Sequence, residues 1–248
     1  MKNSSTSLTK LTLQKFKRNS WGVFSFIFLC ACVCLALFAY VLAPDDSKNA
    51  NQMHLSIHSK SPGFKVKMLK IPYAEEEQNS LSEFFIGKKN TALEIPISDY
   101  IIQDDLLRIT EYNDEGVDGI IKDYPISLFF KADDINKVPE LYIAEKHFLL
   151  GTDKYGRDLL SRMLIGIRIS LAIGFVSVFI SLIIGISMGA IAGYFGGKVD
   201  AVIMWIINVT WSIPTLLLVI AITLALGKGF WQVFIAVGLT MWVEVARV

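Results

Sequence analysis

Three long stretches without a formal charge constrain the fold of this chain more than any other feature. They run from Trp21 to Ala43, from Ile169 to Gly197 and from Ala201 to Gly227, with 23, 29 and 27 residues. About 20 apolar residues in a helix cross the roughly 30 Å hydrocarbon layer of a bilayer, so each stretch is long enough to span it. A fourth run, Gly229–Val243, has 15 residues and fits a buried or re-entrant helix as well as a span.

Composition and charge distribution agree with a membrane location. Hydrophobic residues make up 53% of the 248 positions and the mean hydropathy is +0.47, more than a soluble domain of this length needs for its core. Residues 1–20 carry five basic and no acidic side chains, whereas residues 44–147 carry 12 basic and 19 acidic ones. Basic residues beside a span favour the cytoplasmic side. We therefore expect the amino terminus in the cytoplasm and the acidic middle segment outside it.

These boundaries predict an all-α polytopic membrane protein with an inserted extracytoplasmic lobe that is β-rich or mixed α/β. Residues 64–68 and 93–97 alternate between apolar and polar side chains as half-buried strands do, and residues 124–131 give a shorter candidate. The expected order is a cytoplasmic tail at 1–20, a span at 21–43, the lobe at 44–147, an interfacial helical segment at 148–168 and a transmembrane core at 169–248, with helices at about 169–194, 201–226 and 229–246.

The interfacial segment contains a polar turn followed by a helical pattern. Thr152 or Asp153 can cap the helix by accepting a backbone N–H, and apolar residues then recur at helical spacing from Leu160 to Ile167. The arginines beside this apolar face can reach lipid headgroups. The alternative is that they receive an external substrate-binding protein.

The second apolar stretch carries small residues at successive four-residue steps. They are Ser177, Ser181, Gly185, Gly189 and Gly193. Small side chains on one helix face let another helix approach closely, and close packing drives helix association in lipid. We expect this helix to pack centrally, and the same face can serve as a sliding surface in a transporter.

The third apolar stretch contains a proline and a group of polar side chains. Pro214 lacks an N–H and is expected to kink the helix, while Asn208, Ser212 and Thr215 share one face. These polar groups either satisfy the backbone freed by the kink or line a translocation pathway. The three stretches contain no ionisable carboxylate, so a proton relay inside the membrane is excluded for them.

The sequence contains no pattern typical of an enzyme. It has no glycine-rich phosphate-binding loop, no nucleophile with a plausible base and no zinc motif. Its three cysteines all lie in the first apolar stretch, where we interpret them as small apolar residues. His54 and His58 are four residues apart, a spacing that can hold a metal on a helix, but we interpret them as exposed loop histidines. We expect no catalytic site, cofactor or metal.

The polar turn before the second stretch resembles a known signature. It reads Gly-Thr-Asp-x-x-Gly-Arg-Asp-x-x-Ser-Arg and consists of Gly151, Thr152, Asp153, Gly156, Arg157, Asp158, Ser161 and Arg162. The likeness continues through residues 193–200 and 212–214 and ends at Ala246 and Arg247. Over about 100 residues the chain resembles the dipeptide and oligopeptide permeases of ATP-driven (ABC) importers, which are binding-protein-dependent inner-membrane components with a MetI-like transmembrane domain.

The resemblance implies a multi-pass permease subunit of the bacterial inner membrane that forms part of the pathway for di- or oligopeptides and is not itself an enzyme. It also implies four partners: a second permease subunit, two cytoplasmic ATPase subunits and an extracytoplasmic substrate-binding protein. Relatives continue after Ala-Arg with an ATPase-docking loop, whereas this sequence stops at Val248, so we expect weak ATPase binding. The alternative functions are a membrane-anchored extracytoplasmic sensor or binding module, and a nickel-type permease.

Overall fold

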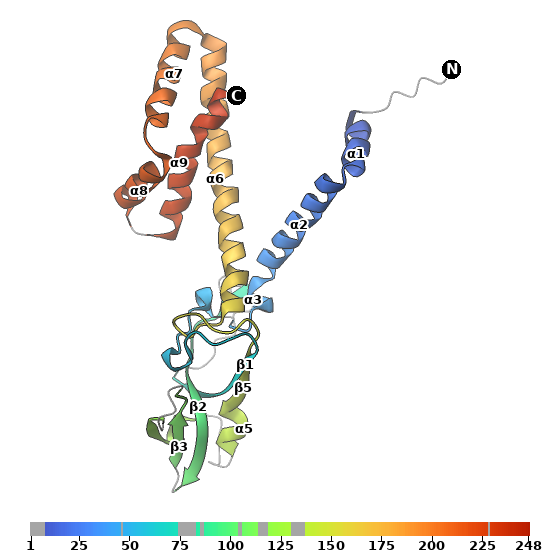
Figure 1. Ribbon diagram of the computed structural model, residues 1–248. Coiled ribbons are helices and arrows are strands. Elements are labelled where there is room, and N and C mark those ends of the chain that lie inside the picture. Colours follow the sequence, from blue (N-terminus) through green and yellow to red (C-terminus); the bar gives the residue numbers. More distant parts are fainter. Residues whose placement is uncertain are drawn as a thin grey trace, which may run out of the picture. The chain divides into compact units, whose positions relative to one another are not determined.

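The computed structural model describes residues 8–45, 47–73, 83–84, 87–103, 106–113, 119–129, 137–227 and 229–248. The chain divides into two compact units, Met1–Arg168 and Ile169–Val248 (Figure 1). The first unit holds the predicted tail, first span and lobe, and the second holds the predicted transmembrane core.

The first unit begins with three helices. They are α1 (Leu8–Arg18), α2 (Ser20–Leu37) and α3 (Ala39–Leu42). α2 follows Asn19, whose side chain accepts a hydrogen bond of 3.2 Å from the Gly22 N–H and so satisfies one of the free donors of a helix start. By length and composition, the 18 residues of α2 are enough to cross a membrane.

An antiparallel sheet of five strands forms the body of the lobe, in the order β4-β3-β2-β1-β5 (Figure 1). The strands are β1 (Phe64–Pro72), β2 (Ala92–Gln103), β3 (Leu106–Glu111), β4 (Ile121–Pro125) and β5 (Ile143–Phe148). Short helices connect them: η1 (Lys48–Ala50), η2 (Leu55–Ile57), η3 (Ile126–Leu128) and α5 (Val138–Tyr142). β5 comes last in the sequence but pairs with β1, so the two ends of the lobe meet in the sheet.

β1 has buried apolar residues on both of its faces. Leu69 on one face belongs to a core with residues of β2, β3 and α5, while the neighbouring Met68 lies on the other face against η2 and β5. The first core is Leu69, Ile71, Ile95, Ile97, Leu107, Ile109, Phe129 and Val138, and the second is Ile57, Val66, Met68 and Phe148. The burial of apolar side chains on both faces stabilises the lobe without disulfides, since the cysteines of the chain lie in α2.

The second unit is helical. α6 (Leu159–Phe195) starts in the first unit and continues into the second, followed by α7 (Gly197–Trp211), α8 (Thr215–Leu226) and α9 (Phe230–Arg247). α6 has 37 residues, so at 1.5 Å per residue it is about 55 Å long. Within the described residues, α2 and α6 are long and apolar enough to cross a membrane, and α7 with α8 gives a third span if this pair, bent by 93°, counts as one.

The predicted all-α class is wrong, because the chain is mixed α and β. That class followed from the apolar stretches, which are helical since a backbone in lipid must satisfy its own hydrogen bonds. The polar segment is free of this requirement and forms a five-stranded sheet with cores of its own. The strand candidates at 64–68 and 93–97 lie in β1 and β2; the candidate at 124–131 contains the end of β4, η3 and residues outside the described ones.

The interfacial segment predicted at 148–168 is divided between two kinds of structure. Residues 149–158 form a loop, and residues 159–168 are the first turns of α6, which continues without a break. The polar signature therefore lies mostly in the loop between β5 and α6.

Candidate functional site

The loop 149–158 is attached to the segment before β1 through Gly151 and Thr152. Gly151 has φ +76°, and a Cβ at this position would lie 2.1 Å from the carbonyl oxygen of Lys60. The Thr152 hydroxyl donates to the Ile57 carbonyl at 2.5 Å and accepts from the Lys60 N–H at 2.9 Å. Thr152 is buried, so these bonds are shielded from water. The first two signature residues thus join segments about 90 positions apart in the sequence.

The second glycine of the signature makes an equally close contact. Gly156 has φ +72°, and a Cβ there would lie 1.8 Å from the His54 carbonyl oxygen. The His54 N–H donates to the Tyr155 carbonyl at 3.1 Å. A larger residue at position 156 is excluded both by the left-handed backbone and by the space available.

Asp153 organises the turn of the loop. Its carboxylate accepts hydrogen bonds from the N–H groups of Tyr155 and Arg157 and from the Arg157 guanidinium at 2.8 Å, and Arg162 lies 3.5 Å away. Burial by itself raises the pKa of Asp153, but the Arg157 and backbone hydrogen bonds outweigh burial, and the pKa is lowered. Arg157 also donates to the Asn51 side chain at 2.9 Å. The aspartate and arginine of the signature are therefore paired inside the fold.

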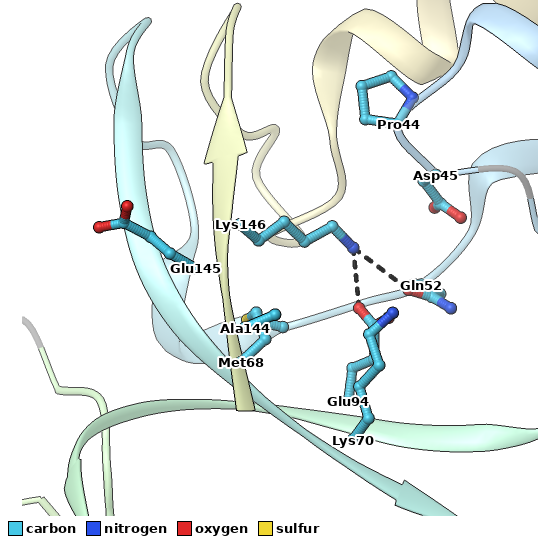
Figure 2. A pocket seen from close by; sticks show the side chains of 9 residues that line it. All are labelled: Pro44, Asp45, Gln52, Met68, Lys70, Glu94, Ala144, Glu145 and Lys146. Carbon is cyan, nitrogen blue, oxygen red and sulfur yellow. Dashed lines mark hydrogen bonds and ion pairs between the residues drawn. The ribbon is translucent and has the colours of Figure 1, made fainter. Parts of the chain in front are cut away.

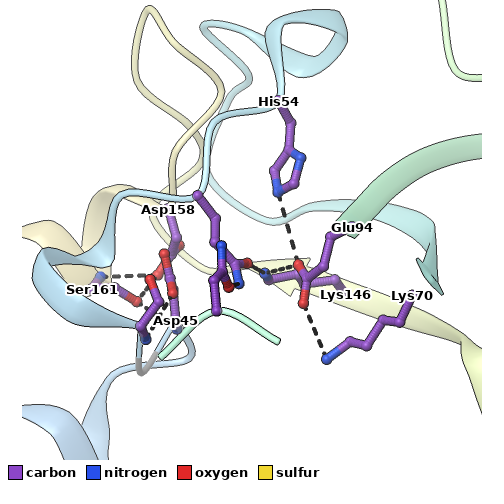
Figure 3. Close-up of polar contacts among 10 residues, drawn as sticks. Asp45, His54, Lys70, Glu94, Lys146, Asp158 and Ser161 are labelled. Carbon is purple, nitrogen blue, oxygen red and sulfur yellow. Dashed lines mark hydrogen bonds and ion pairs between the residues drawn. The ribbon is translucent and has the colours of Figure 1, made fainter. Parts of the chain in front are cut away.

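The start of α6 is capped by Asp158, not by the predicted Thr152 or Asp153. The Asp158 carboxylate accepts from both the N–H and the hydroxyl of Ser161 (Figure 3). The Ser161 hydroxyl in turn accepts the N–H of Asp45 at 2.9 Å. Ser161 is fully buried and Asp45 and Asp158 nearly so. This node joins the chain that follows α3 to the first turn of α6.

A cluster of charged side chains lies beside this node. We call it the Glu94 cluster; it consists of His54, Lys70, Glu94 and Lys146 (Figure 3). Glu94 Oε2 lies 2.8 Å from the Lys146 ammonium, and Oε1 lies 3.1 Å from that of Lys70. His54 Nε2 is 3.8 Å from Glu94 Oε2, too far for a hydrogen bond. His54 and the Glu94 side chain are each only 7% exposed.

Two pKa values in the cluster are shifted. Burial and then the Lys146 charge lower the pKa of His54 from 6.5, in spite of the opposing effect of Glu94 and Asp45. Burial raises the pKa of Glu94, but the charges and hydrogen bonds of Lys146 and Lys70 outweigh it and lower the pKa. At neutral pH the cluster therefore holds a neutral imidazole beside an ionised carboxylate.

A pocket of about 190 Å³ opens next to the Glu94 cluster (Figure 2). Its lining residues are Pro44, Asp45, Gln52, Met68, Lys70, Glu94, Ala144, Glu145 and Lys146. Lys146 Nζ also lies 3.5 Å from the side-chain amide oxygen of Gln52, in addition to its contact with Glu94. The pocket is thus lined mainly by polar groups of both charges, and Lys146 projects into it.

Sequence reasoning missed the Glu94 cluster. The interpretation of His54 as an exposed loop histidine is wrong, since it is buried, whereas His58 is exposed. Glu94 and Lys146 occupy polar positions in strands whose residues alternate between polar and apolar. The sequence pattern therefore gave no indication that they are buried. Across the described ranges, no three or more His, Cys, Asp or Glu side chains are grouped as a metal would need.

In the second unit, the small-residue face of α6 lies against α9. Ser177 donates to the Phe234 carbonyl at 3.2 Å, and a Cβ on Gly185 would lie 2.5 Å from Val245 Cβ. A Cβ on Gly189 would lie 2.9 Å from the Ala246 carbonyl oxygen. Gly238 on α9 itself makes such a contact, because its Cβ would lie 2.8 Å from a side-chain atom of Ile180 and 3.2 Å from the carbonyl of Ser177. We call this contact the α6–α9 seam.

The other two residues of the small-residue face differ from each other. Ser181 is buried and donates to the Val178 carbonyl within its own helix, whereas no atom lies within 4 Å of a Cβ built on Gly193. Along the seam, residue numbers increase together on both helices, from the contact of Ser177 with Phe234 to that of Gly189 with Ala246. α6 and α9 therefore run in the same direction.

The polar face of the third stretch lies at the break between α7 and α8. α7 ends at Trp211, and Pro214 precedes α8 with φ −54°. The Ser212 hydroxyl donates to the main-chain carbonyl of Asn208 at 2.8 Å, a contact that satisfies backbone near the break. The residues of this polar face are all exposed in the structure: Asn208, Ser212 and Thr215.

Comparison with known proteins gives two family matches. Residues 7–62 match the N-terminal transmembrane domain of oligopeptide transport permease C, and residues 182–248 match the binding-protein-dependent transport system inner membrane component. Two separate parts of the chain are therefore similar to peptide permeases. The resemblance predicted from the signature is thereby confirmed.

Individual relatives agree with the family matches. The chain is 41% identical over 123 residues to the dipeptide transport system permease protein DppC of Lactococcus lactis, which is 48% of this chain and 36% of that protein. It is 42% identical over 104 residues to the oligopeptide transport system permease protein OppC of Escherichia coli, covering 42% of this chain and 34% of that protein. The matches span about a third of these relatives. Residues 63–181, with the sheet and the whole signature, lie outside both family models.

The node at the start of α6 generates a first prediction. In Ser161→Ala the Asp45 N–H loses its acceptor, and the Asp158 carboxylate loses the Ser161 hydroxyl while it keeps the Ser161 N–H, so we expect a loss of about 1–3 kcal/mol in stability. Hydrogen exchange of the full chain in detergent should show faster exchange at the Asp45 amide. Ser187→Ala on the same helix is the control, since its exposed hydroxyl only contacts the Ile183 carbonyl. Equal exchange in the two variants would contradict the assigned role.

The seam generates a second prediction. Gly185→Ala places a Cβ within 2.5 Å of Val245, and we expect a loss of about 1–3 kcal/mol from overpacking. Gly193→Ala meets open space and should leave stability unchanged or raise it by up to about 1 kcal/mol through helix propensity. Thermal unfolding in one detergent, followed by tryptophan fluorescence, measures both. A Gly185→Ala variant as stable as Gly193→Ala would exclude the close contact.

Proposed function

We propose that the chain is a transmembrane permease subunit of an ATP-driven importer and forms part of the pathway for di- or oligopeptides across the bacterial inner membrane. The observation that carries the proposal is the architecture of residues 182–248, the segment that matches the inner membrane component family. There α6 and α9 run parallel, with their backbones in close contact. The helical pair between them must return across the same layer, so α7 and α8 count as one broken span.

The broken span is the proposed pathway element. A break between helices leaves main-chain groups without helical partners, and such backbone is tolerated at membrane depth only in protein or beside water. Asn208, Ser212 and Thr215 lie at this break and are neutral hydrogen-bonding groups, which suit varied peptides better than a fixed charge. The described α7 and α8 bring no charged side chain to the break.

Energy comes from partners in this proposal. A second permease subunit, two cytoplasmic ATPase subunits and an extracytoplasmic substrate-binding protein complete the importer, and ATP is hydrolysed in the ATPases. The amino terminus faces the cytoplasm, α2 and α6 cross the membrane, and the sheet lies outside. Arg157 and Arg162 of the signature are held by Asp153, so we assign the signature to joining the lobe and α6.

The topology gives a third prediction. After the three cysteines of α2 are replaced by serine, single cysteines are introduced at Lys10, Lys65 or Lys198, all exposed positions. An impermeant maleimide should label position 65 in intact spheroplasts and positions 10 and 198 only after permeabilisation. Labelling of positions 10 and 65 from the same side would refute the proposed arrangement.

Uptake gives a fourth prediction. A host strain lacking this gene should fail to grow when a dipeptide is its source of a required amino acid, and the intact gene should restore growth. Gly189→Leu adds a side chain where even a Cβ would lie 2.9 Å from the Ala246 carbonyl, so we expect loss of uptake. A Cβ on Gly193 has no atom within 4 Å, so Gly193→Leu should retain uptake at matched membrane levels.

A sensor or binding module is the competing function, and the two-sided core and polar pocket of the lobe favour it. The growth assay separates the two functions. A sensor requires the lobe and tolerates seam variants, so growth on the dipeptide with Gly189→Leu, or no growth defect in the deletion strain, would refute the permease.

A further inference from the structure

His54 lies between the signature loop and the sheet. Its main chain contacts the loop. The His54 N–H donates to the Tyr155 carbonyl at 3.1 Å, and the His54 carbonyl oxygen lies so close to Gly156 that a Cβ there would not fit. Its imidazole points to the sheet, with Nε2 3.8 Å from Glu94 Oε2 (Figure 3). The same residue therefore contacts the loop that leads into α6 and a charged cluster on the sheet.

The charged groups around the imidazole come from four segments. Asp45 belongs to the chain after α3, Glu94 to β2 and Lys146 to β5, while Lys70 of β1 lies on the far oxygen of Glu94. The carboxylate of Glu94 already faces two ammonium groups, at 2.8 Å and 3.1 Å. A protonated His54 would be a third cation beside this carboxylate, and the Lys146 ammonium would be its immediate neighbour.

We propose that His54 is a proton-sensitive contact that holds the signature loop on the sheet at neutral pH and releases it when the surroundings of the lobe become acidic. The proposal rests on the fold of the lobe; only its physiological setting, an acidic exterior, depends on the proposed topology. A mobile join between lobe and α6 would make the importer responsive to external pH.

The chemical step is the transfer of one proton from a hydronium ion of the solvent to Nε2 of His54, which leaves a water molecule. The imidazolium then attracts Glu94 and repels Lys146, and it must be solvated in a site where the residue is 7% exposed. The 190 Å³ pocket gives Lys146 a place to move, towards the carboxylate of Asp45 (Figure 2). If the imidazole moves towards water instead, the hydrogen bond from the His54 N–H to the Tyr155 carbonyl breaks. Gly156 is then no longer held against the His54 carbonyl.

The sign of the effect follows from linkage. The pKa of His54 is lower in the folded protein than its ordinary value of 6.5, so the open form binds more protons. The contribution of neutral His54 to the closed loop is complete above pH 6.5. It is lost as the pH falls from there through the lowered pKa of the folded protein. Glu94, whose pKa is lowered from 4.5, contributes a separate loss only below that pH. The two windows are thus distinguishable.

The titration of His54 is measured directly on the full chain. The sequence has three histidines, so a protein labelled with ¹³C-histidine in detergent gives three imidazole signals, assigned with His58→Gln and His147→Gln. We expect the His54 signal to titrate below 6.5, the ordinary value for histidine. A His54 midpoint at or above 6.5 would overturn the proposal, and this measurement needs no variant at His54.

Release of the loop is measured by hydrogen exchange at pH 7.5 and pH 5.5. We compare the intact sequence, His54→Gln and His58→Gln at each pH, so the intrinsic pH dependence of exchange cancels. The open population of loop 151–158 should rise at pH 5.5 by up to about tenfold, the limit that one proton bound with a pKa of 6.5 sets one unit below it. His58→Gln should show the same rise and His54→Gln none. The same rise in His54→Gln, or no rise in the intact sequence, would refute the proposal.

Discussion

The close approach of two helix backbones is the constraint on which the second unit depends. In lipid there is little hydrophobic gain in bringing helices together, so contact relies on fit. Ser177, Gly185 and Gly189 give α6 a face without bulk, and Gly238 does the same on α9. Because the contacts ascend along both helices, this one seam also fixes their relative direction and the path of the helices between them.

A similar principle holds in the lobe, where buried hydrogen bonds join distant segments. Thr152 satisfies both a donor and an acceptor of residues 57–60, and Ser161 links Asp45 to Asp158. A buried polar group without a partner costs more than an average hydrogen bond contributes, so each of these partners is difficult to replace. These signature residues thus make contacts within the fold that hold the loop to the segment before β1 and to the start of α6.

The sequence predicted the features that depend on local pattern. The apolar stretches are helical, the alternating residues 64–68 and 93–97 lie in strands, and the peptide-permease resemblance is confirmed. Features that depend on tertiary contacts were not predicted correctly. The cap of α6 is Asp158 because the helix begins at Leu159, later than the pattern indicated, and Asp158 is the residue just before it. The all-α class failed because it weighted the apolar stretches over the polar segment.

The Glu94 cluster shows why the rest was hidden. His54 is polar and lies in an irregular segment, and Glu94 and Lys146 occupy the polar positions of alternating strands, so each reads as solvent-exposed by itself. They are brought together because β5 pairs with β1 and β1 with β2, an order that connects residues 94 and 146 across the sheet. Burial of one carboxylate then requires cations, and two lysines provide them. Burial, and then the charge of Lys146, lower the pKa of His54, so the imidazole remains neutral where the sheet meets the loop 149–158.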